Sequence, residues 1–225
     1  MSEIQLRVKR ILEELAQTNE DLLALADDIW LSIDHNDNEA LQEGVSFKAE
    51  YNEKVAAFDQ LSSEISKLVE GYMGLDLEVE TEAASESNAN QRIIKALDKH
   101  QKHSLDENFT YKKPFGFSIE GKGYQNVGKW KLMYFQTLKY LCKEKDNFRD
   151  ILDAKEFRSN RGNKDFSSTP TDLRIGQLVS DGIYAETNLS ANQIRDRIKK
   201  LLKFFDIPID SFVIYLKEDR DWNET

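Results

Sequence analysis

Two stripes of apolar residues with a heptad spacing occupy the first 75 residues of the chain. The first stripe advances in alternating steps of four and three, with Thr18 as its one polar member, through Ile4, Val8, Ile11, Leu15, Leu22, Leu25 and Ile29. The second has the same spacing and includes Tyr51, Val55, Phe58, Ile65 and Val69. Such spacing gathers apolar side chains on one narrow face of a helix, which has to be buried against another helix. Residues 1–75 are therefore predicted to form helices of the coiled-coil type.

The polar run 34–38 between the two stripes predicts a turn, with Asp37 or Asn38 capping the second helix. Two helices joined by a short turn form an antiparallel hairpin, which by itself buries too little apolar surface for firm stability. We expect a second copy to supply the missing surface, as in a four-helix bundle. The residues predicted to mediate oligomerisation are Ile4, Val8, Ile11, Leu15, Leu22, Leu25, Ile29, Val55, Phe58 and Ile65. The alternative is that the hairpin packs on the rest of its own chain.

The charges divide the 225-residue chain into unequal halves. Residues 1–90 contain 6 Lys/Arg and 21 Asp/Glu, whereas residues 91–225 contain 25 and 20. Residues 76–90 have five acidic residues, no basic residue and few apolar ones, which predicts a flexible acidic linker. The expected organisation is a helical hairpin over 1–75, a linker over 76–90 and a mildly basic domain over 91–225. The acidic half is also a candidate for masking the basic domain.

Residues 91–225 show both strand and helix patterns. Alternating apolar residues from Phe115 to Ile119, followed by a Gly-rich turn at 120–123, predict a β-hairpin. Helical spacing follows from Trp130, and Ser190 with Gln193 forms a capping box that opens another helix. A late strand is expected at 212–216. The predicted fold class is α+β, with an N-terminal antiparallel helical hairpin followed by a small α+β domain whose sheet is covered by about three helices.

Basic residues gather in the second half, where residues 108–205 contain 19 Lys/Arg and 11 Asp/Glu. Such a surface attracts the phosphates of nucleic acid through counterion release, and it equally suits an acidic protein. The residues predicted to contact nucleic acid or an acidic partner are Arg158, Arg161, Lys164, Arg195, Lys199, Lys200 and Lys203.

Catalytic motifs are weak in this sequence. Glu120 and Lys122, with Asp106 upstream, have the residue types of a Mg²⁺-dependent nuclease, but the match is short and lies in a Gly-rich turn. His100 and His103 are expected to be solvated rather than metal ligands, and no cofactor is predicted. The sequence favours a non-enzymatic protein that oligomerises through its coiled coil and binds a partner, with nucleic acid as one candidate. The alternatives are a protein-only adaptor or accessory subunit, and then a nuclease.

The single Cys142 predicts a reduced, buried thiol and a cytoplasmic location, and the chain has no apolar run long enough for a membrane span. The block from Phe115 to Leu216, above all the segment 184–192, resembles accessory domains of prokaryotic restriction and mobile-element proteins. This resemblance implies an accessory role and assigns no function to any residue.

Overall fold

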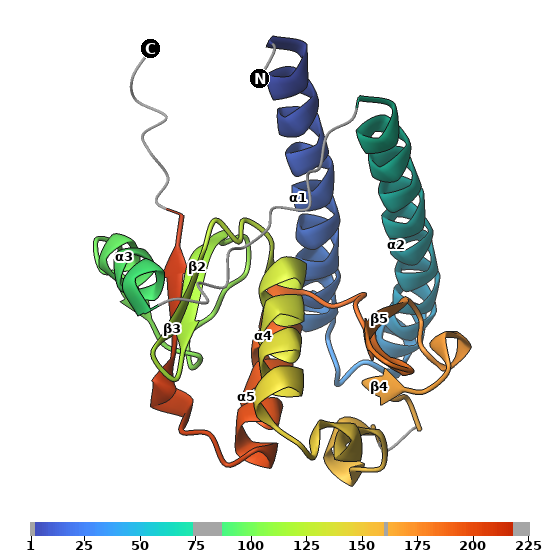
Figure 1. The fold of residues 1–225 in the computed structure, drawn as a ribbon. Coiled ribbons are helices and arrows are strands. Elements are labelled where there is room, and N and C mark those ends of the chain that lie inside the picture. The colour runs from blue at the N-terminus through green and yellow to red at the C-terminus, as the bar shows by residue number, and fades with distance from the viewer. Residues whose placement is uncertain (1–2, 74–86, 160–161, 218–225) are drawn as a thin grey trace. The chain divides into compact units, whose positions relative to one another are not determined.

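A computed structural model describes residues 3–73, 87–159 and 162–217 (Figure 1). Contacts group the chain into two compact units, one formed by Met1–Val79 with Asn188–Ser190 and the other by Glu80–Thr187 with Ala191–Thr225. Most of the predicted linker 76–90 lies outside the described residues. Its last part is helical, because helix α3 (Ser87–Leu97) begins within the predicted range.

The N-terminal unit is the predicted antiparallel hairpin. Helix α1 (Glu3–Ser32) and helix α2 (Asn38–Met73) run side by side in opposite directions (Figure 1). The carboxylate of Asp37 accepts hydrogen bonds from the backbone N–H groups of Glu39 (2.9 Å) and Ala40 (3.3 Å), which confirms Asp37 as the cap of α2. The connection between the helices is therefore a short turn fixed by its own polar side chains.

The second unit contains a four-stranded antiparallel sheet with the order β1-β7-β2-β3. Its strands are β1 (Lys102–His103), β2 (Pro114–Ile119), β3 (Lys122–Gln125) and β7 (Phe212–Leu216). The predicted β-hairpin is confirmed, with Glu120 and Gly121 as its two turn residues. Both have positive φ angles, 47° and 78°, as a tight hairpin turn requires. The turn is shorter than expected, since Lys122 and Gly123 belong to β3.

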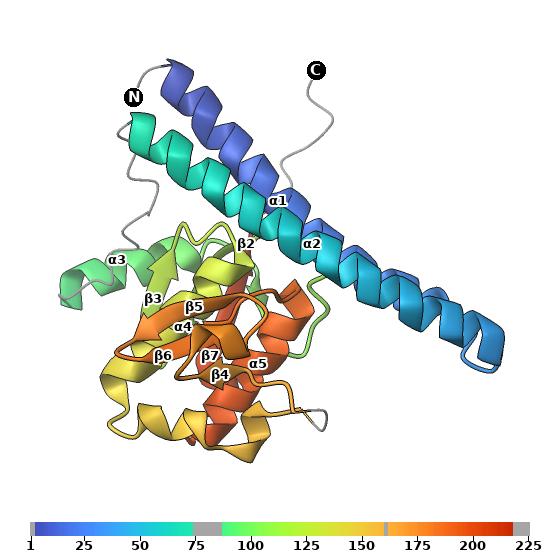
Figure 2. The same cartoon turned by 90° about the vertical axis from the view of Figure 1, so that its right-hand side faces the viewer.

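A second sheet, which the sequence did not predict, has three antiparallel strands in the order β4-β6-β5 (Figure 2). They are β4 (Phe166–Ser167), β5 (Gly176–Ser180) and β6 (Ile183–Glu186). Strand β4 has only two residues, and β5 is exposed along much of its length, so neither leaves a clear alternating pattern. Short 3₁₀ segments, Phe148–Leu152, Lys155–Phe157, Pro170–Asp172 and Ile209–Ser211, connect the elements.

Two helices complete the core of the second unit. Helix α4 (Trp130–Glu144) packs against β2 and β5, and helix α5 (Ala191–Phe204) packs against α4. Trp130, Leu138, Ile198 and Leu201 are fully buried between these layers. The ring of Phe117 stacks on Phe212 of the neighbouring strand, with 5.2 Å between the centroids. Helices and sheets thus share one aromatic-rich core, as the predicted α+β class requires.

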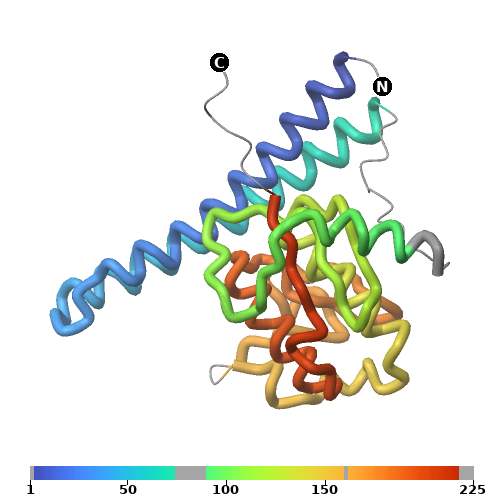
Figure 3. Tube along the Cα trace, turned by 90° about the vertical axis from the view of Figure 1, so that its left-hand side faces the viewer, coloured from blue at the N-terminus to red at the C-terminus, as the bar shows by residue number. Residues whose placement is uncertain are grey.

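Helix α3 covers one face of the first sheet, where it contacts β3 and β2 and where Ile93 and Leu97 pack with Tyr215 of β7 (Figure 3). The side chain of Asn90 donates to the backbone oxygen of Gly121 and accepts from the N–H of Gly123, each at 2.8 Å. A Cβ atom on Gly123 would lie 2.9 Å from side-chain atoms of both Ile93 and Ile94, so the close approach of helix and strand depends on this glycine. Asn90 thereby satisfies backbone groups at the edge of the sheet.

Candidate functional site

The predicted stripe of α1 is divided between two environments. Its half-buried members are Val8, Leu15, Leu22 and Ile29. Three others are exposed, namely Ile4 (65%), Ile11 (51%) and Leu25 (40%). The centre of the contact with α2 is formed by Leu12 and Asn19, which are buried. Each of them directly follows a residue of the predicted stripe. On α2, Val55 is buried, Phe58 is half-buried and Ile65 is 41% exposed. The hairpin therefore uses only part of the predicted stripe.

Most of the exposed large apolar residues of the two helices lie on the same side of the hairpin, whereas Leu6, Leu31 and Val45 lie on the opposite side. A step of about 100° per residue places Ile4 and Ile11 to one side of the line through Leu12 and Asn19. On α2 the same step places Leu61 and Leu68 to one side of the line through Val55 and Ser62. Because the two helices are antiparallel, this side of α2 and the Ile4 side of α1 face the same way. On this side the Tyr51 hydroxyl donates to the backbone oxygen of Leu22 (3.0 Å), whereas Lys48 and Asp27 form an ion pair (3.2 Å) on the opposite side.

We refer to this exposed surface as the apolar face. It consists of side chains that are each at least 40% exposed: Ile4, Ile11, Leu25, Phe47, Leu61, Ile65, Leu68 and Tyr72. Sequence reasoning missed Phe47, Leu61 and Leu68. These three residues belong to a second heptad spacing on α2, beside the predicted stripe, and this spacing would have predicted them. Lys54 is its one polar member. One side of the hairpin is thus apolar over most of its length.

The predicted cationic residues of α5 take part in contacts within the second unit. Arg195 donates to the backbone oxygen of Glu107 (2.6 Å), and Lys199 forms an ion pair with Asp106 (2.6 Å). Lys199 lowers the pKa of the Asp106 carboxyl. These contacts hold the 104–110 loop on the helix. Cations that are engaged in this way have a reduced attraction for phosphate, because each one faces an acceptor of its own chain.

The other predicted cations fall into three groups. Lys164 pairs with Asp172 at 2.6 Å, Lys200 lies 4.0 Å from Asp165, and Arg158 lies 3.8 Å from Asp153. Lys203 is exposed. Arg161 lies outside the described residues. The structure therefore does not gather these seven cations into one open surface among the residues that it describes.

A buried polar cluster lies between α4, α5 and the second sheet. Asp165 is 7% exposed and pairs with Arg197 at 2.7 Å, while Glu186 accepts the backbone N–H of Arg174 at 2.7 Å. Burial raises the pKa of Asp165, and Arg197 and Lys200 oppose that shift. Burial also raises the pKa of the Tyr134 hydroxyl, which has no hydrogen-bond partner among the described residues. The cluster ties together loops and helices of the core.

The side chains of the nuclease triplet, Asp106, Glu120 and Lys122, have other partners and do not form one site. Glu120 accepts a hydrogen bond from the Tyr140 hydroxyl (2.9 Å), and the Lys122 ammonium lies over the ring of Tyr140 at 5.5 Å. Asp106 is paired with Lys199 instead. Within the described ranges there is no group of three or more His, Cys, Asp or Glu side chains with metal-binding geometry.

The two histidines are less solvated than expected. The Nδ1 atom of His100 is buried, and its ring lies 4.2 Å from that of Phe115. His103 is close to Glu107, with 2.8 Å between Nδ1 and Oε2. Both side chains are partly buried rather than solvated, because the His100 ring packs on Phe115 of β2 and His103, on the edge strand β1, contacts Glu107. Cys142 is partly buried, whereas a buried thiol was expected.

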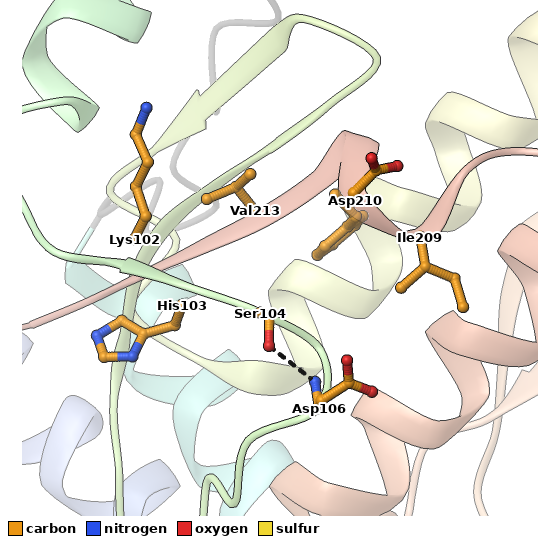
Figure 4. Close-up of a pocket in the computed structure, with 8 residues that line it drawn as sticks. Lys102, His103, Ser104, Asp106, Ile209, Asp210 and Val213 are labelled. Carbon is orange, nitrogen blue, oxygen red and sulfur yellow. Dashed lines mark hydrogen bonds between the residues drawn. The ribbon is translucent and has the colours of Figure 1, made fainter.

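An open depression of about 640 Å³ lies beside β1 and β7 (Figure 4). Its lining includes His103, Ser104, Asp106, Asp210 and Val213. The backbone N–H of Asp106 donates to the Ser104 hydroxyl at 3.2 Å, as the dashed line in Figure 4 shows. His103 and Asp106 are already bonded to Glu107 and Lys199, so the polar groups of this depression mainly satisfy one another.

Comparison of the chain with protein-family models, with curated proteins and with solved structures found no match. None of the helices in the described parts of the chain is both long enough and apolar enough to cross a lipid bilayer.

Proposed function

We propose that this protein is a non-enzymatic assembly protein whose hairpin joins copies of the chain and whose C-terminal unit binds a partner. The apolar face carries the first half of this proposal. Large apolar side chains that continue along one side of a helical hairpin are typical of an interface rather than of a solvated surface. The proposal includes a cytoplasmic location, which is supported by the single Cys142.

A second copy is the occupant that suits this face. The chain is strongly acidic, but the open end of the hairpin is nearly neutral: residues 3–16 contain three cations and three carboxylates, and residues 59–73 contain one and three. All the cations of α1, Arg7, Lys9 and Arg10, lie in this part. Pairing of α1 from one copy with α2 from the other would set these cations near the carboxylates of residues 59–73. The acidic parts of the two copies, which repel each other, would then lie mainly outside the interface.

The size of the face also suits self-association. From Ile4 to Leu25 a helix advances about 32 Å, and two adjacent helices are about 20 Å wide. The product, about 640 Å², approaches the roughly 800 Å² that each partner contributes to a standard stable interface. Two hairpins packed by these faces form a four-helix bundle, which buries the stripe residues that a single hairpin leaves exposed.

The proposal is tested by making the face polar. We expect the double substitution Leu61→Gln/Leu68→Gln to reduce self-association of the full chain by at least about tenfold, because two central apolar contacts are lost. Sedimentation velocity measures the change. The control is Leu178→Gln, which alters a leucine on β5 of the other unit that is about as exposed as Leu61 (54% and 57%) and should leave association unchanged. Association that is the same in both variants would contradict the proposal.

Self-association would increase the apparent affinity of the C-terminal unit for its partner. When linked copies hold several binding surfaces, the second contact becomes intramolecular, and apparent affinity rises by roughly 10² to 10⁴. Nucleic acid and an acidic protein are the two partner classes, and a protein-only adaptor is the alternative function. Binding through phosphates weakens linearly with rising salt on a log–log scale, so a salt series separates the two.

A further inference from the structure

A second concentration of positive charge in the described chain lies outside the cationic residues predicted from the sequence. Residues 108–143, which form β2, β3 and most of α4, contain seven lysines and one acidic residue. That acidic residue, Glu120, is hydrogen-bonded to Tyr140. This stretch therefore has an excess of six positive charges in 36 residues, in a chain whose net charge is −10.

Two hydrogen bonds bring lysine-bearing segments together at the start of α4. The indole N–H of Trp130 donates to the backbone oxygen of Lys112 at 2.6 Å. The N–H of Val127 donates to the oxygen of Phe115 at 3.0 Å, so the segments 112–115 and 127–130 run close together. Lys112 and Lys113 thereby lie near Lys129, which is the residue before α4. We refer to these three lysines, with Tyr111, as the lysine patch.

The three lysines of the patch are available to a partner. Lys112, Lys113 and Lys129 are exposed, and none of the ion pairs among the described residues includes them, although the charge of Lys112 acts on the Glu107 carboxylate from a greater distance. The Lys112 ammonium lies 5.8 Å from the ring centroid of buried Phe109, which holds the side chain at the surface. Lys199 differs, because its ammonium is paired with Asp106.

An aromatic ring lies beside these cations. Tyr111 is 53% exposed and has a φ angle of 58°, a conformation that is uncommon for a residue other than glycine. Exposed aromatic rings within a cationic surface stack on the bases of single-stranded nucleic acid, while the cations contact its phosphates. An acidic protein would contact the same cations but would present no base to the ring, and competition by polyglutamate separates the two partners in the test below.

We propose that the lysine patch binds the sugar-phosphate backbone of a single-stranded nucleic acid, with Tyr111 stacking on a base. This inference rests on the partner-binding half of the proposed function and does not require self-association. It replaces the face of α5 with the start of α4 as the nucleic-acid-binding surface.

The test uses the full chain and fluorescently labelled single strands of DNA and RNA of about 20 nucleotides, which exceed the site size of most single-strand-binding folds. Binding is measured by anisotropy over a series of salt concentrations. We expect Lys112→Gln/Lys113→Gln/Lys129→Gln to reduce affinity roughly 100-fold at about 0.1 M salt and to lower the log–log salt slope by about two. Tyr111→Ala should reduce affinity about tenfold, and Tyr111→Phe, which retains the ring, should not.

The matched control is Lys95→Gln/Lys155→Gln/Lys203→Gln, which removes the same charge from exposed positions on other elements. An equal loss of affinity in this control would overturn the lysine patch, since only total charge would then matter. The proposal would also be overturned if the wild-type chain bound neither labelled strand at low salt. It would be overturned as well if polyglutamate displaced the labelled strand as readily as the unlabelled strand does. Sedimentation of the same samples reports self-association separately, so a monomer that shows patch-dependent binding would refute only the assembly half of the proposed function.

Discussion

Asn19 is a polar residue in the middle of the hairpin interface. It is 8% exposed, and its Nδ2 atom donates to the Asp59 carboxylate at 2.8 Å across the two helices. A polar pair at such a position costs stability relative to apolar packing, and it fixes the register, because any sliding of the helices separates donor from acceptor. The hairpin thus has one register in which this hydrogen bond forms.

We expect Asn19→Ala to lower the free energy of unfolding by about 1 kcal/mol, because the hydrogen bond to Asp59 is lost. The double variant Asn19→Leu/Asp59→Leu should raise it above that of the wild type, because both polar groups are replaced by apolar ones. Far-UV circular dichroism during urea unfolding measures both changes. A double variant that is less stable than the wild type would show that the pair contributes net stability and not only register.

Asp165 and Arg197 lead to a pH-dependent prediction. Burial already raises the pKa of Asp165 and Arg197 opposes this, so Arg197→Met should raise it further. Above that pKa the folded variant then holds a buried carboxylate whose remaining cationic neighbour is Lys200, at 4.0 Å, at a cost of about 3 kcal/mol. The cost should shrink as the pH falls through the folded-state pKa, because the protonated carboxyl has no charge to desolvate.

Urea unfolding of the variant and the wild type at about pH 7 and about pH 5 tests this directly. Arg197→Lys is the control, since it retains a positive charge near Asp165. A loss of stability in Arg197→Met that is the same at both pH values would mean that the ion pair has no role, and that the side chain acts through packing alone.

At the scale of elements, Asn90 joins α3 to the turn between β2 and β3. Asn90→Ala removes the two hydrogen bonds to Gly121 and Gly123 and should lower the free energy of unfolding by about 2 kcal/mol. Asn90→Asp keeps the acceptor for the Gly123 N–H and should lose about half as much. Hydrogen exchange at Gly123 would report the change locally, and unchanged protection in Asn90→Ala would contradict this role.

Elements with a strong periodic pattern could be predicted from the sequence. The hairpin, the β2–β3 pair, α4, α5 and the late strand β7 all followed from apolar spacing and turn residues. The face of α1 that contacts α2 did not. Ile11 and Leu12 are adjacent members of a wide apolar stripe, and only the partner helix decides between them, as α2 buries Leu12 and leaves Ile11 exposed. Strands β1 and β4 have two residues each and were too short to leave a pattern.

The contacts of the predicted cations could not be predicted from the sequence, for a related reason. Arg195 and Lys199 have the spacing of an open cationic helix face, but their acceptors, Glu107 and Asp106, lie far earlier in the chain, at separations of 88 and 93 residues. Sequence spacing along one helix cannot report such long-range partners. The lysine patch has a sequence signal, the scarcity of acidic residues over 108–143, where Glu120 is the single one, and this signal is visible only when charge is counted over a short segment.

At the scale of the whole molecule, the account depends on how charge and apolar surface are distributed. Acidic residues are concentrated near the turn of the hairpin and in residues 76–86, whereas the open end of the hairpin combines near-neutral charge with most of the apolar face. The lysine-rich segment 108–143 lies in the other unit. Assembly and partner binding are therefore assigned to separate parts of the chain.

Sedimentation equilibrium of the unmodified full chain, over a range of concentrations, tests the central claim most directly. If the apolar face binds a second copy, the measured mass should reach at least twice 26.1 kDa and fall toward 26.1 kDa on dilution. A mass of 26.1 kDa at every concentration up to about 100 µM would contradict self-association through the hairpin.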